Sequence, residues 1–309
     1  MRIAIFGSGG VGGYYGGRLA QSGQSVAFIA RGEHRAAIAA HGLQVESPDG
    51  DFIINPANVF EDPAQIGPVD IVIVATKTWD IPAIARHMRP LLGKKTCVLP
   101  LENGVDSGER LAAVVGPDRV LGGLCRISSF ILRPGVIRHV GGRASIMFGE
   151  MDNRPSERVL ALLDTFAAIP QVKAEVPIDI QVAMWEKFVF ISAVSCVGSV
   201  TRQPIGGMRS VPETRMLLLS ALQETAAVGR ARGVSLPEGL AERILLNNID
   251  ALDPTTIPSM ERDVLDGRPT ELESMSGAVL RMGEEAGIPT PTHAFLYAAL
   301  KPLDIQARR

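Results

Sequence analysis

The glycines near the start of the chain have the spacing found where a protein backbone approaches a phosphate. Residues 7–12 read Gly7-Ser8-Gly9-Gly10-Val11-Gly12, directly after a short apolar run and directly before a helical segment. In such a unit the first glycine permits a tight turn, the second lets the backbone approach a pyrophosphate, and the third lets helix and strand pack closely. Free N–H groups at the helix N-terminus favour negative charge there. With a second strand expected at residues 24–30, the stretch predicts a dinucleotide-binding unit.

The residue after that second strand distinguishes between the two nicotinamide dinucleotides. An acidic residue here binds the ribose 2′-OH of NAD, whereas an arginine accommodates the 2′-phosphate of NADP. This chain has Arg31, with Arg35 four residues later and Glu33 as the only nearby acid. Arg31 therefore predicts NADP(H) as the cofactor, and a solvated loop charge is the alternative interpretation.

Further polar side chains stand where chemistry could be done, each with a purely structural alternative. Lys187 precedes the apolar stretch 188–200, at the expected entrance of a buried helix, and could serve as a proton donor or be a surface lysine with a packed stem. Glu271 lies in the first turn of an expected helix, where a carboxylate also suits the dipole. Ser259 can N-cap a short helix. Lys77 and Asn103 each follow an expected strand end, where ligands bind in open α/β sheets, or are ordinary loop residues.

The elements that must position these residues change character near Pro177. Before it, strands expected at 2–6, 24–30, 69–75 and 96–101 alternate with helices, and pairs of strands at 43–54 and 129–148 read as hairpins. This pattern predicts a doubly wound sheet with antiparallel edge strands. After it, helical periodicity dominates, at 182–200, 213–232, 237–250, 270–286 and 292–300. We therefore expect an α/β protein with a Rossmann-type dinucleotide-binding domain at 1–177 and an all-α domain at 178–309.

Composition excludes several other classes of protein. The 309 residues carry a net charge of −2, which gives no sign of a nucleic-acid or membrane partner. The three cysteines are widely spaced, as expected of reduced core thiols, and the five histidines show no metal-ligand spacing. The N-terminal apolar run is too short for a signal sequence, and the longest apolar stretch, 188–200, is too short to span a membrane. These features predict a soluble cytoplasmic protein without a metal.

Taken together, the motifs resemble those of the ketopantoate reductase (2-dehydropantoate 2-reductase) family. The resemblance rests on the glycine loop with Arg31, Val74-Ala75-Thr76-Lys77, Glu102-Asn103-Gly104, Trp185-Glu186-Lys187, Ser259-Met260 and Thr270-Glu271, in this order, and spans the chain to about residue 287. It implies a Rossmann domain joined to a helical domain, with the active site in the cleft between them. The implied reaction is the NADPH-dependent reduction of a 2-oxo acid.

The resemblance also implies a role for each residue. Lys187 would be the general acid that protonates the developing alkoxide, and Glu271 would anchor both the cofactor and this lysine. Asn103 would bridge nicotinamide and substrate, and Ser259 would bind substrate. Lys77 and Ser128 would lie near the cofactor. A homodimer is compatible with the sequence, which indicates no particular interface.

One departure from the family concerns the substrate pocket. Ketopantoate reductases place Asn four and eight residues after the catalytic lysine, where this chain has Ile191 and Ser195. Ile191 cannot form a hydrogen bond, and Ser195 is shorter than Asn, although we still expect it to contact substrate. Ketopantoate is therefore the first candidate substrate and a more apolar 2-oxo acid the second. A non-catalytic NADP-binding sensor is a third hypothesis, disfavoured because a sensor needs neither Lys187 nor Glu271.

Overall fold

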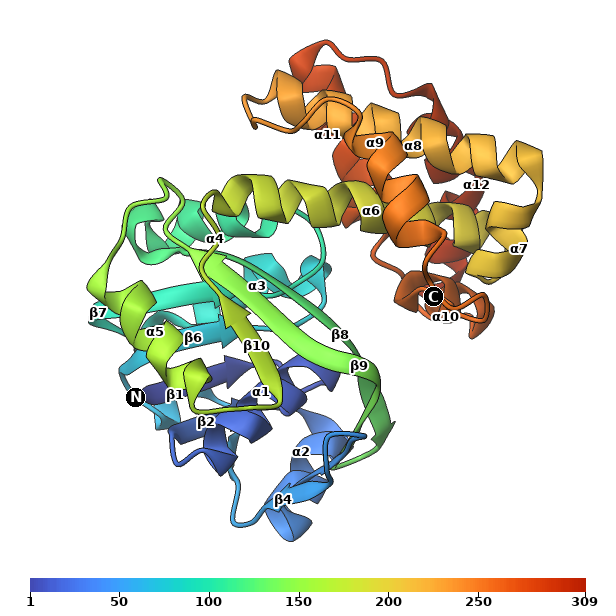
Figure 1. The fold of residues 1–309 in the computed structure, drawn as a ribbon. Coiled ribbons are helices and arrows are strands. Elements are labelled where there is room, and N and C mark those ends of the chain that lie inside the picture. Colours follow the sequence, from blue (N-terminus) through green and yellow to red (C-terminus); the bar gives the residue numbers. More distant parts are fainter. The chain divides into compact units, whose positions relative to one another are not determined.

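The computed structural model describes every residue from Met1 to Arg309 and divides the chain into two compact units (Figure 1). The first unit holds residues 1–102 and 107–180, and the second holds 103–106 and 181–309. The helical unit therefore includes a four-residue segment from the middle of the N-terminal half. Nothing in the periodicity of the sequence indicates this excursion.

The first unit is built on a five-stranded parallel sheet with the order β5-β2-β1-β6-β7. Its strands are β1 (Arg2–Phe6), β2 (Ser25–Ile29), β5 (Asn58–Phe60), β6 (Val69–Val74) and β7 (Leu92–Pro100). The helices of this unit are α1 (Gly10–Gln21), α2 (Gly32–His41), α3 (Ile81–His87), α4 (Ser107–Val115) and α5 (Glu157–Ala167). Short 3₁₀ turns lie at η1 (Pro63–Gln65), η2 (Thr78–Asp80), η3 (Arg89–Leu91) and η4 (Pro117–Arg119). The expected α/β class with a Rossmann-type sheet is confirmed.

The antiparallel strands, however, do not lie at the edges of this sheet, and that part of the prediction is wrong. They form a second sheet with the order β10-β9-β3-β4, in which β8 also pairs with β9. Its strands are β3 (Leu43–Glu46), β4 (Phe52–Ile54), β8 (Gly122–Arg133), β9 (Val136–Gly149) and β10 (Val172–Glu175). The two expected hairpins are present, but β9 pairs in parallel with β3 and β10, which are distant in sequence. Local periodicity carries no information on such pairings.

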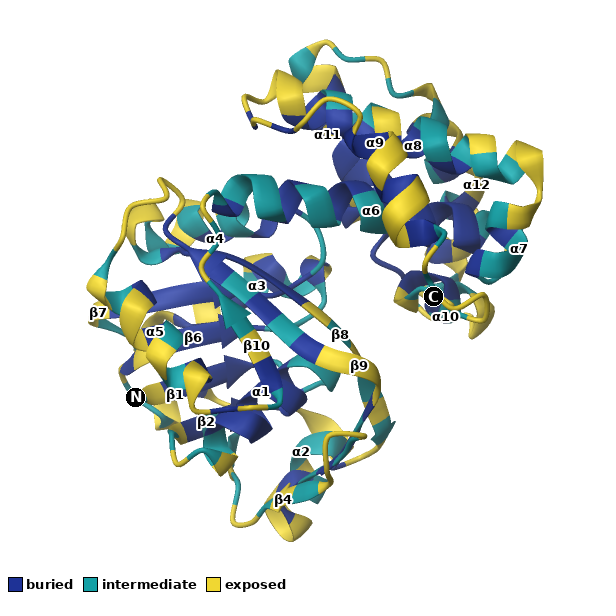
Figure 2. Cartoon of the chain, in the orientation of Figure 1, coloured by how far each residue is buried: buried dark blue, intermediate teal, exposed yellow.

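Strand β1 shows why both faces of the parallel sheet are covered. Successive side chains of a strand point to opposite faces. Ile3 and Ile5 accordingly enter one core, with α1 and the second sheet, and Ala4 and Phe6 enter another, with α3 and α4. Figure 2 shows the strands of this sheet as largely buried. Because both faces are covered, a ligand can bind at the carboxyl ends of the strands and at the loops that follow them.

The second unit is entirely helical. Its elements are α6 (Ile180–Thr201), α7 (Ile205–Ser210), α8 (Pro212–Ala231), α9 (Leu240–Ile244), a π-helical turn η5 (Leu245–Ile249), α10 (Ser259–Leu265), η6 (Leu272–Ser274), α11 (Ser276–Ala286) and α12 (Pro291–Ala307). A fully buried chain of polar contacts joins four of these helices, as described below. The predicted all-α character of the C-terminal part is confirmed.

Two details of the helices differ from the prediction in ways that matter for the site. Helix α6 begins at Ile180, close to the predicted start at residue 182, so Lys187 lies two turns inside the helix and not at its entrance. Helix α11 begins only at Ser276, and Glu271 precedes the 3₁₀ turn η6. The first-turn dipole therefore does not account for this carboxylate.

Helix α6 is long and apolar enough to cross a membrane by composition, with a mean hydropathy of 1.4 over its most apolar window. Of that window, 61% is buried inside the protein. Burial of this kind is typical of the central helix of a helical unit.

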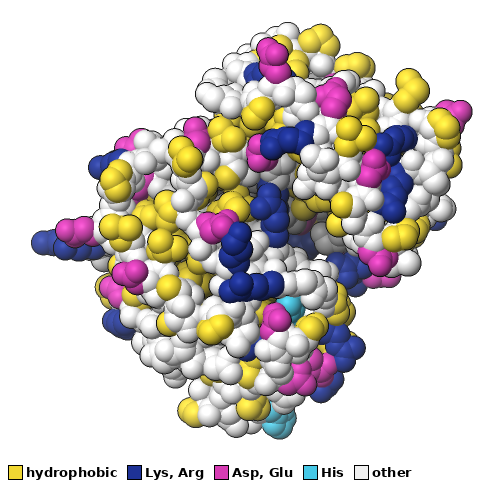
Figure 3. Space-filling view, viewed as in Figure 1, with side chains coloured by type: hydrophobic (Ala, Val, Ile, Leu, Met, Phe, Trp, Pro, Cys, Tyr) yellow, Lys and Arg dark blue, Asp and Glu magenta, His cyan; other side chains and the backbone are white.

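On the face drawn in Figure 3, acidic and basic side chains are interspersed, in keeping with the net charge of −2.

Candidate active site

The glycine-rich turn after β1 has the geometry that its sequence predicts. Gly7 has φ of +94°, a conformation that favours glycine. A Cβ on Gly12 would lie 2.0 Å from the carbonyl oxygen of Gly7, so only glycine permits this approach of α1 to the turn. A Cβ on Gly9, in contrast, would meet no atom within 4 Å. The turn is therefore tight where helix packs on strand and open at the glycine expected to face a pyrophosphate.

The other residues of the turn are held by the protein itself. Ser8 is buried, and its hydroxyl donates to the carbonyl oxygen of Ile29 at the end of β2 (3.1 Å). A Cβ on Gly10 would come within 2.3 Å of the Ser129 carbonyl oxygen, so β8 passes close to the start of α1. Ser128, the exposed residue before it, lies at an irregularity of β8. This contact brings Ser128 near the glycine turn.

A histidine that the sequence analysis did not single out supports this turn. His34 Nδ1 accepts a hydrogen bond from the Gly135 N–H (3.1 Å), and its Nε2 donates to the Ser8 carbonyl oxygen (2.8 Å). Burial lowers the pKa of His34 and so favours the neutral ring that these two bonds require. His34 thereby ties α2 and the β8–β9 turn to the glycine turn. Its partners are far apart in sequence, so no local motif could have indicated this role.

Arg31 lies directly before α2, beyond the end of β2. Its side chain is exposed and forms no ion pair within the unit. The neighbouring Arg35 instead pairs with Glu61 (3.4 Å). Arg31 is therefore the arginine that can turn to a ligand phosphate without breaking a contact.

The loops after β6 and β7 meet at their carboxyl ends. Thr76 Oγ1 donates to Glu102 Oε1 (3.4 Å), and Glu102 is buried. A Cβ on Gly7 would lie 2.5 Å from Thr76 Cγ2, so the loop after β6 also touches the glycine turn. Lys77 is half-buried, with its ammonium 5.7 Å from the centre of the Trp79 ring. Lys77 directly follows Thr76, the residue that contacts the glycine turn.

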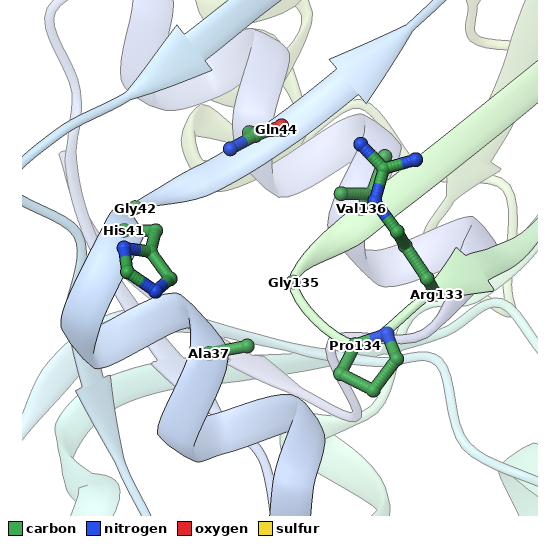
Figure 4. A pocket seen from close by; sticks show the side chains of 8 residues that line it. All are labelled: Ala37, His41, Gly42, Gln44, Arg133, Pro134, Gly135 and Val136. Carbon is green, nitrogen blue, oxygen red and sulfur yellow. The ribbon is translucent and has the colours of Figure 1, made fainter.

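A small pocket elsewhere in this unit contains none of the predicted site residues. It lies between the end of α2 and the β8–β9 turn, where His41, Gln44 and Arg133 line it (Figure 4). Its volume is about 120 Å³, below the range of about 300–1,000 Å³ usual for sites of organic ligands. We do not assign it a role in the function.

In the helical unit, the segment with Asn103 lies beside the turn with Glu271. Gly104 has φ of +109°, and a Cβ there would lie 3.3 Å from the Ser274 carbonyl oxygen. Asp106 pairs with Arg281 (3.1 Å). The Ser274 N–H in turn donates to the Glu271 carbonyl oxygen (2.9 Å). The segments that carry Asn103 and Glu271, 168 residues apart in the sequence, therefore approach each other closely at Gly104 and Ser274.

A second anchor fixes the Glu271 turn from the other side. Both the N–H and the hydroxyl of Thr270 donate to Asp304 Oδ1, at 2.8 and 2.9 Å. Arg308 pairs with the same carboxylate (2.8 Å). Glu271 itself is 6% exposed. A buried acid on a turn held from both sides is typical of a preorganised site.

Helix α6 is held in one rotation about its axis by packing and by polar contacts. Trp185 packs against α8, where a Cβ on Gly229 would lie 2.7 Å from its ring. Farther along, Ser192 contacts Thr225, Thr225 contacts His293, and His293 contacts Ser276, all at 2.9 to 3.1 Å. All four of these polar residues are completely buried. They join α6 to α8, α12 and α11.

This rotation sets the position of the candidate catalytic row. Lys187, Ile191, Ser195 and Gly198 are spaced by four, four and three residues, so they form one row along α6. Lys187 and Ile191 are half-buried and Ser195 is buried. We call these four residues the α6 row.

Ser259 does not cap α10, so the structural alternative for this residue is wrong. The capping position is Pro258, and Ser259 is the first helical residue, with an exposed side chain. Its hydroxyl therefore has no structural task in the helix. Two residues later, Glu261 is completely buried, and sequence reasoning gave no sign of it.

These features define a class of protein: a dinucleotide-binding sheet followed by a helical unit that carries a lysine and a buried acid is the arrangement of a two-domain oxidoreductase. Comparison with known proteins agrees. Residues 3–153 match the family model "Ketopantoate reductase PanE/ApbA", and residues 179–304 match its C-terminal counterpart. The 2-dehydropantoate 2-reductase of Mesorhizobium japonicum is 30% identical over 99% of this chain and 98% of its own. The chain belongs to the ketopantoate reductase family.

Solved structures show the same relationship. The crystal structure of 2-dehydropantoate 2-reductase from Geobacter metallireducens has a TM-score of 0.90 and 32% identity, over 98% of this chain and 99% of that one. A D-mandelate dehydrogenase solved with NADH and anilino(oxo)acetate has a TM-score of 0.89 at 22% identity, over 100% and 99% of the two chains, and so shares the fold. The predicted family resemblance is confirmed, and this chain is an oxidoreductase of that family.

Proposed function

We propose that this protein reduces a 2-oxo acid to the 2-hydroxy acid with NADPH, and that 2-dehydropantoate is its first candidate substrate. The observation that carries the proposal is that Lys187, Asn103, Glu271 and Ser259 all belong to one compact unit, although they lie far apart in sequence. A binding protein that performs no reaction needs no such combination of a lysine and a buried acid. We also propose that the enzyme is soluble and cytoplasmic.

The cofactor assignment rests on residues of the first unit. The open space over Gly9 and the tight packing at Gly12 fit a pyrophosphate at the start of α1. The exposed guanidinium of Arg31 suits a 2′-phosphate, with which it can form charge-assisted hydrogen bonds. We propose that Lys77 and Ser128 line the remainder of this site.

NADPH, held by the glycine turn and Arg31, would supply the hydride for C2 of the oxo acid. Lys187 donates a proton to the carbonyl oxygen as it gains negative charge, so that the product is a neutral hydroxyl. Glu271 keeps the lysine side chain oriented. Asn103 donates a hydrogen bond from its amide, and Ser259 and Ser195 contact the substrate through their hydroxyls.

A second candidate substrate class is favoured by Ile191. This residue occupies the middle of the α6 row, is half-buried and cannot hydrogen-bond. A more apolar 2-oxo acid would lose less there than a polar one. The D-mandelate dehydrogenase of the same fold, solved with anilino(oxo)acetate, is a reason to include an aromatic compound among those tested.

The test is to follow oxidation of NADPH and of NADH with a panel of 2-oxo acids that contains ketopantoate, pyruvate and phenylglyoxylate. We expect turnover with at least one of them and a preference for NADPH. Tight binding of NADPH without turnover on any 2-oxo acid would support a sensor and contradict the proposal.

A further inference from the structure

One imidazole inside the helical unit is linked to α6 through both of its nitrogens. Nε2 of His293, on α12, lies 2.9 Å from Thr225 Oγ1, which in turn lies 3.1 Å from Ser192 Oγ on α6. Nδ1 lies 3.0 Å from Ser276 Oγ, which lies 3.0 Å from Cys196 Sγ, also on α6. All five side chains are completely buried. Two arms, the Thr225 arm and the Ser276 arm, therefore lead from one ring to α6 and reach it one helical turn apart.

The carbonyl oxygen of Ala221 fixes the tautomer of this ring. It lies 3.1 Å from His293 Nε2 and can only accept, so Nε2 carries the proton and Nδ1 is the acceptor. Burial lowers the pKa of His293, which keeps the ring neutral at neutral pH. Nδ1 thus accepts from the Ser276 hydroxyl, and Nε2 donates toward Ala221 and Thr225. Both ring nitrogens are satisfied, and neither arm can be exchanged for the other.

His293 is itself fixed from α8. The two carboxyl oxygens of Glu224 accept from the backbone N–H groups of Thr292 (2.7 Å) and His293 (3.0 Å), at the start of α12. Glu224 directly precedes Thr225, so α8 holds both the backbone of His293 and one of the two arms. Because α6 contributes nothing to this backbone contact, the ring can serve as a fixed point against which α6 is set.

Stability alone gives no reason for so many polar groups. Replacing both partners of a buried hydrogen bond by apolar groups of the same shape is nearly neutral. Apolar packing, such as that of Trp185 against α8, is non-directional, whereas a hydrogen bond weakens steeply when its donor is out of line. The buried polar side chains therefore fix the rotation of α6 about its axis more closely than apolar side chains would.

The rotation of α6 matters because Lys187 lies on this helix. The two anchored residues, Ser192 and Cys196, directly follow two members of the α6 row. A side-chain atom about 6 Å from the helix axis moves by about 1 Å when the helix turns by about 10°. A misplacement of about 1 Å can lower the rate of a reaction by about 100-fold.

We infer that His293 is a positioning residue of the proposed active site: by fixing the rotation of α6, it keeps Lys187 placed for proton donation. Thr225 and Ser276 transmit this effect. The inference rests on the proposed function, in which Lys187 is the general acid. His293 supplies no proton to the reaction and affects turnover only through the lysine.

The experiment cuts each arm without changing the imidazole. Thr225→Val and Ser276→Ala each remove one hydroxyl, and each should lower kcat by about 10-fold with a 2-oxo acid that the wild type reduces. NADPH affinity, measured by fluorescence titration, should change by less than about twofold. Thr225→Ser keeps the hydroxyl and should retain kcat to within about twofold of the wild type. All assays are run well below the melting temperature of each variant.

Thr201→Val is the matched control. Thr201 lies at the end of α6, and its hydroxyl donates within that helix, to the Val197 carbonyl oxygen (2.8 Å). The variant loses the same group as Thr225→Val but should keep kcat to within about twofold, because neither arm is cut. Equal losses of kcat in these two variants would overturn the inference, since the loss of any hydroxyl would then have the same effect.

A double-mutant cycle with Lys187→Ala separates positioning from a general loss of structure. If the arms act through the lysine, Thr225→Val should lower turnover by less than about twofold in the Lys187→Ala enzyme. Should Thr225→Val not fold, Ser276→Ala completes the same cycle. Losses that multiply, or arm variants that keep full kcat, would overturn the inference alone. A wild type that reduces no 2-oxo acid, or a Lys187→Ala enzyme that keeps most of its turnover, would overturn the proposed function as well.

Discussion

Gly12 rests directly on Gly7: a Cβ on the first would lie 2.0 Å from the carbonyl oxygen of the second. Gly9, between them, would accommodate a Cβ without touching any atom of the protein. Two glycines of one motif thus have different tasks. Gly12 allows the helix to pack on the strand, and Gly9 leaves the backbone open toward a ligand.

This difference predicts opposite outcomes for two equal substitutions. Gly12→Ala should destabilise the protein by about 1–3 kcal/mol, because a methyl group is forced into a packed contact. Gly9→Ala should leave stability nearly unchanged, since its φ of −75° suits any residue, but should weaken NADPH binding. Thermal unfolding and NADPH fluorescence titration of both variants check this. Equal losses of stability would contradict the separate tasks.

For the cofactor preference, the decisive variant is Arg31→Ala. It should raise the KM for NADPH by about tenfold or more, because charge-assisted contacts to the 2′-phosphate are lost, and leave that for NADH nearly unchanged. Arg35→Ala is the matched control, since Arg35 already pairs with Glu61. Steady-state kinetics with both cofactors provides the measurement. If Arg31→Ala weakens both cofactors equally, the NADP assignment is wrong.

Glu261 should make stability depend on pH. Burial raises its pKa from 4.5 to about 7. Between these values the folded protein holds a proton that the unfolded chain has released, so the free energy of unfolding falls as pH rises from about 4.5 to about 7 and then levels off. The loss is about 3 kcal/mol over this range. Glu261→Gln cannot ionise and should be the more stable protein at pH 8, with a smaller difference at pH 5.

Urea denaturation of both proteins at pH 5 and pH 8 measures this effect. Asp266→Asn serves as the control, because this carboxylate follows the same helix but is exposed. A stability difference between wild type and Glu261→Gln that is the same at both pH values would show that Glu261 ionises freely in the folded state.

Ile191→Asn tests which substrate the α6 row is built for. If the pocket is otherwise that of a ketopantoate reductase, the variant should raise kcat/KM for ketopantoate by about 2- to 10-fold, as expected for one added hydrogen bond. Since Ile191 is half-buried, an amide can be placed there without being enclosed. An unchanged melting temperature with lower ketopantoate turnover would indicate a more apolar physiological substrate.

The sequence carried most of the information on the parallel sheet and the helical unit, because both follow from local periodicity. It also indicated the glycine turn, whose spacing reflects a local steric requirement at Gly7 and Gly12. It could not indicate the second sheet, since the pairing of β9 with β3 and β10 joins distant segments. His34 escaped notice for the same reason, because its partners Ser8 and Gly135 are 26 and 101 residues away.

In the helical unit too, contacts between distant residues could not be predicted from the sequence. Lys187 and Glu271 were singled out from their local charge pattern and the family resemblance, although the helix predicted to begin at residue 270 begins only at Ser276. Glu261 was not, because in the sequence it is one acid among several in a polar segment. Only its burial against Gly198 distinguishes it. Tertiary contact, and not residue type, makes such a position informative.

The role of Lys187 is the central claim, and Lys187→Ala tests it most directly. As a general acid, the lysine should contribute about 10² to 10⁴ in turnover number, whereas cofactor affinity should barely change. The measurements are the turnover number with a 2-oxo acid that the wild type reduces and the NADPH affinity by fluorescence titration. Thermal unfolding shows whether the variant folds, and Glu186→Gln is the control on the same helix. We expect a folded variant that binds NADPH normally and turns over 100-fold more slowly or worse. A folded Lys187→Ala enzyme that keeps most of its turnover would contradict the account.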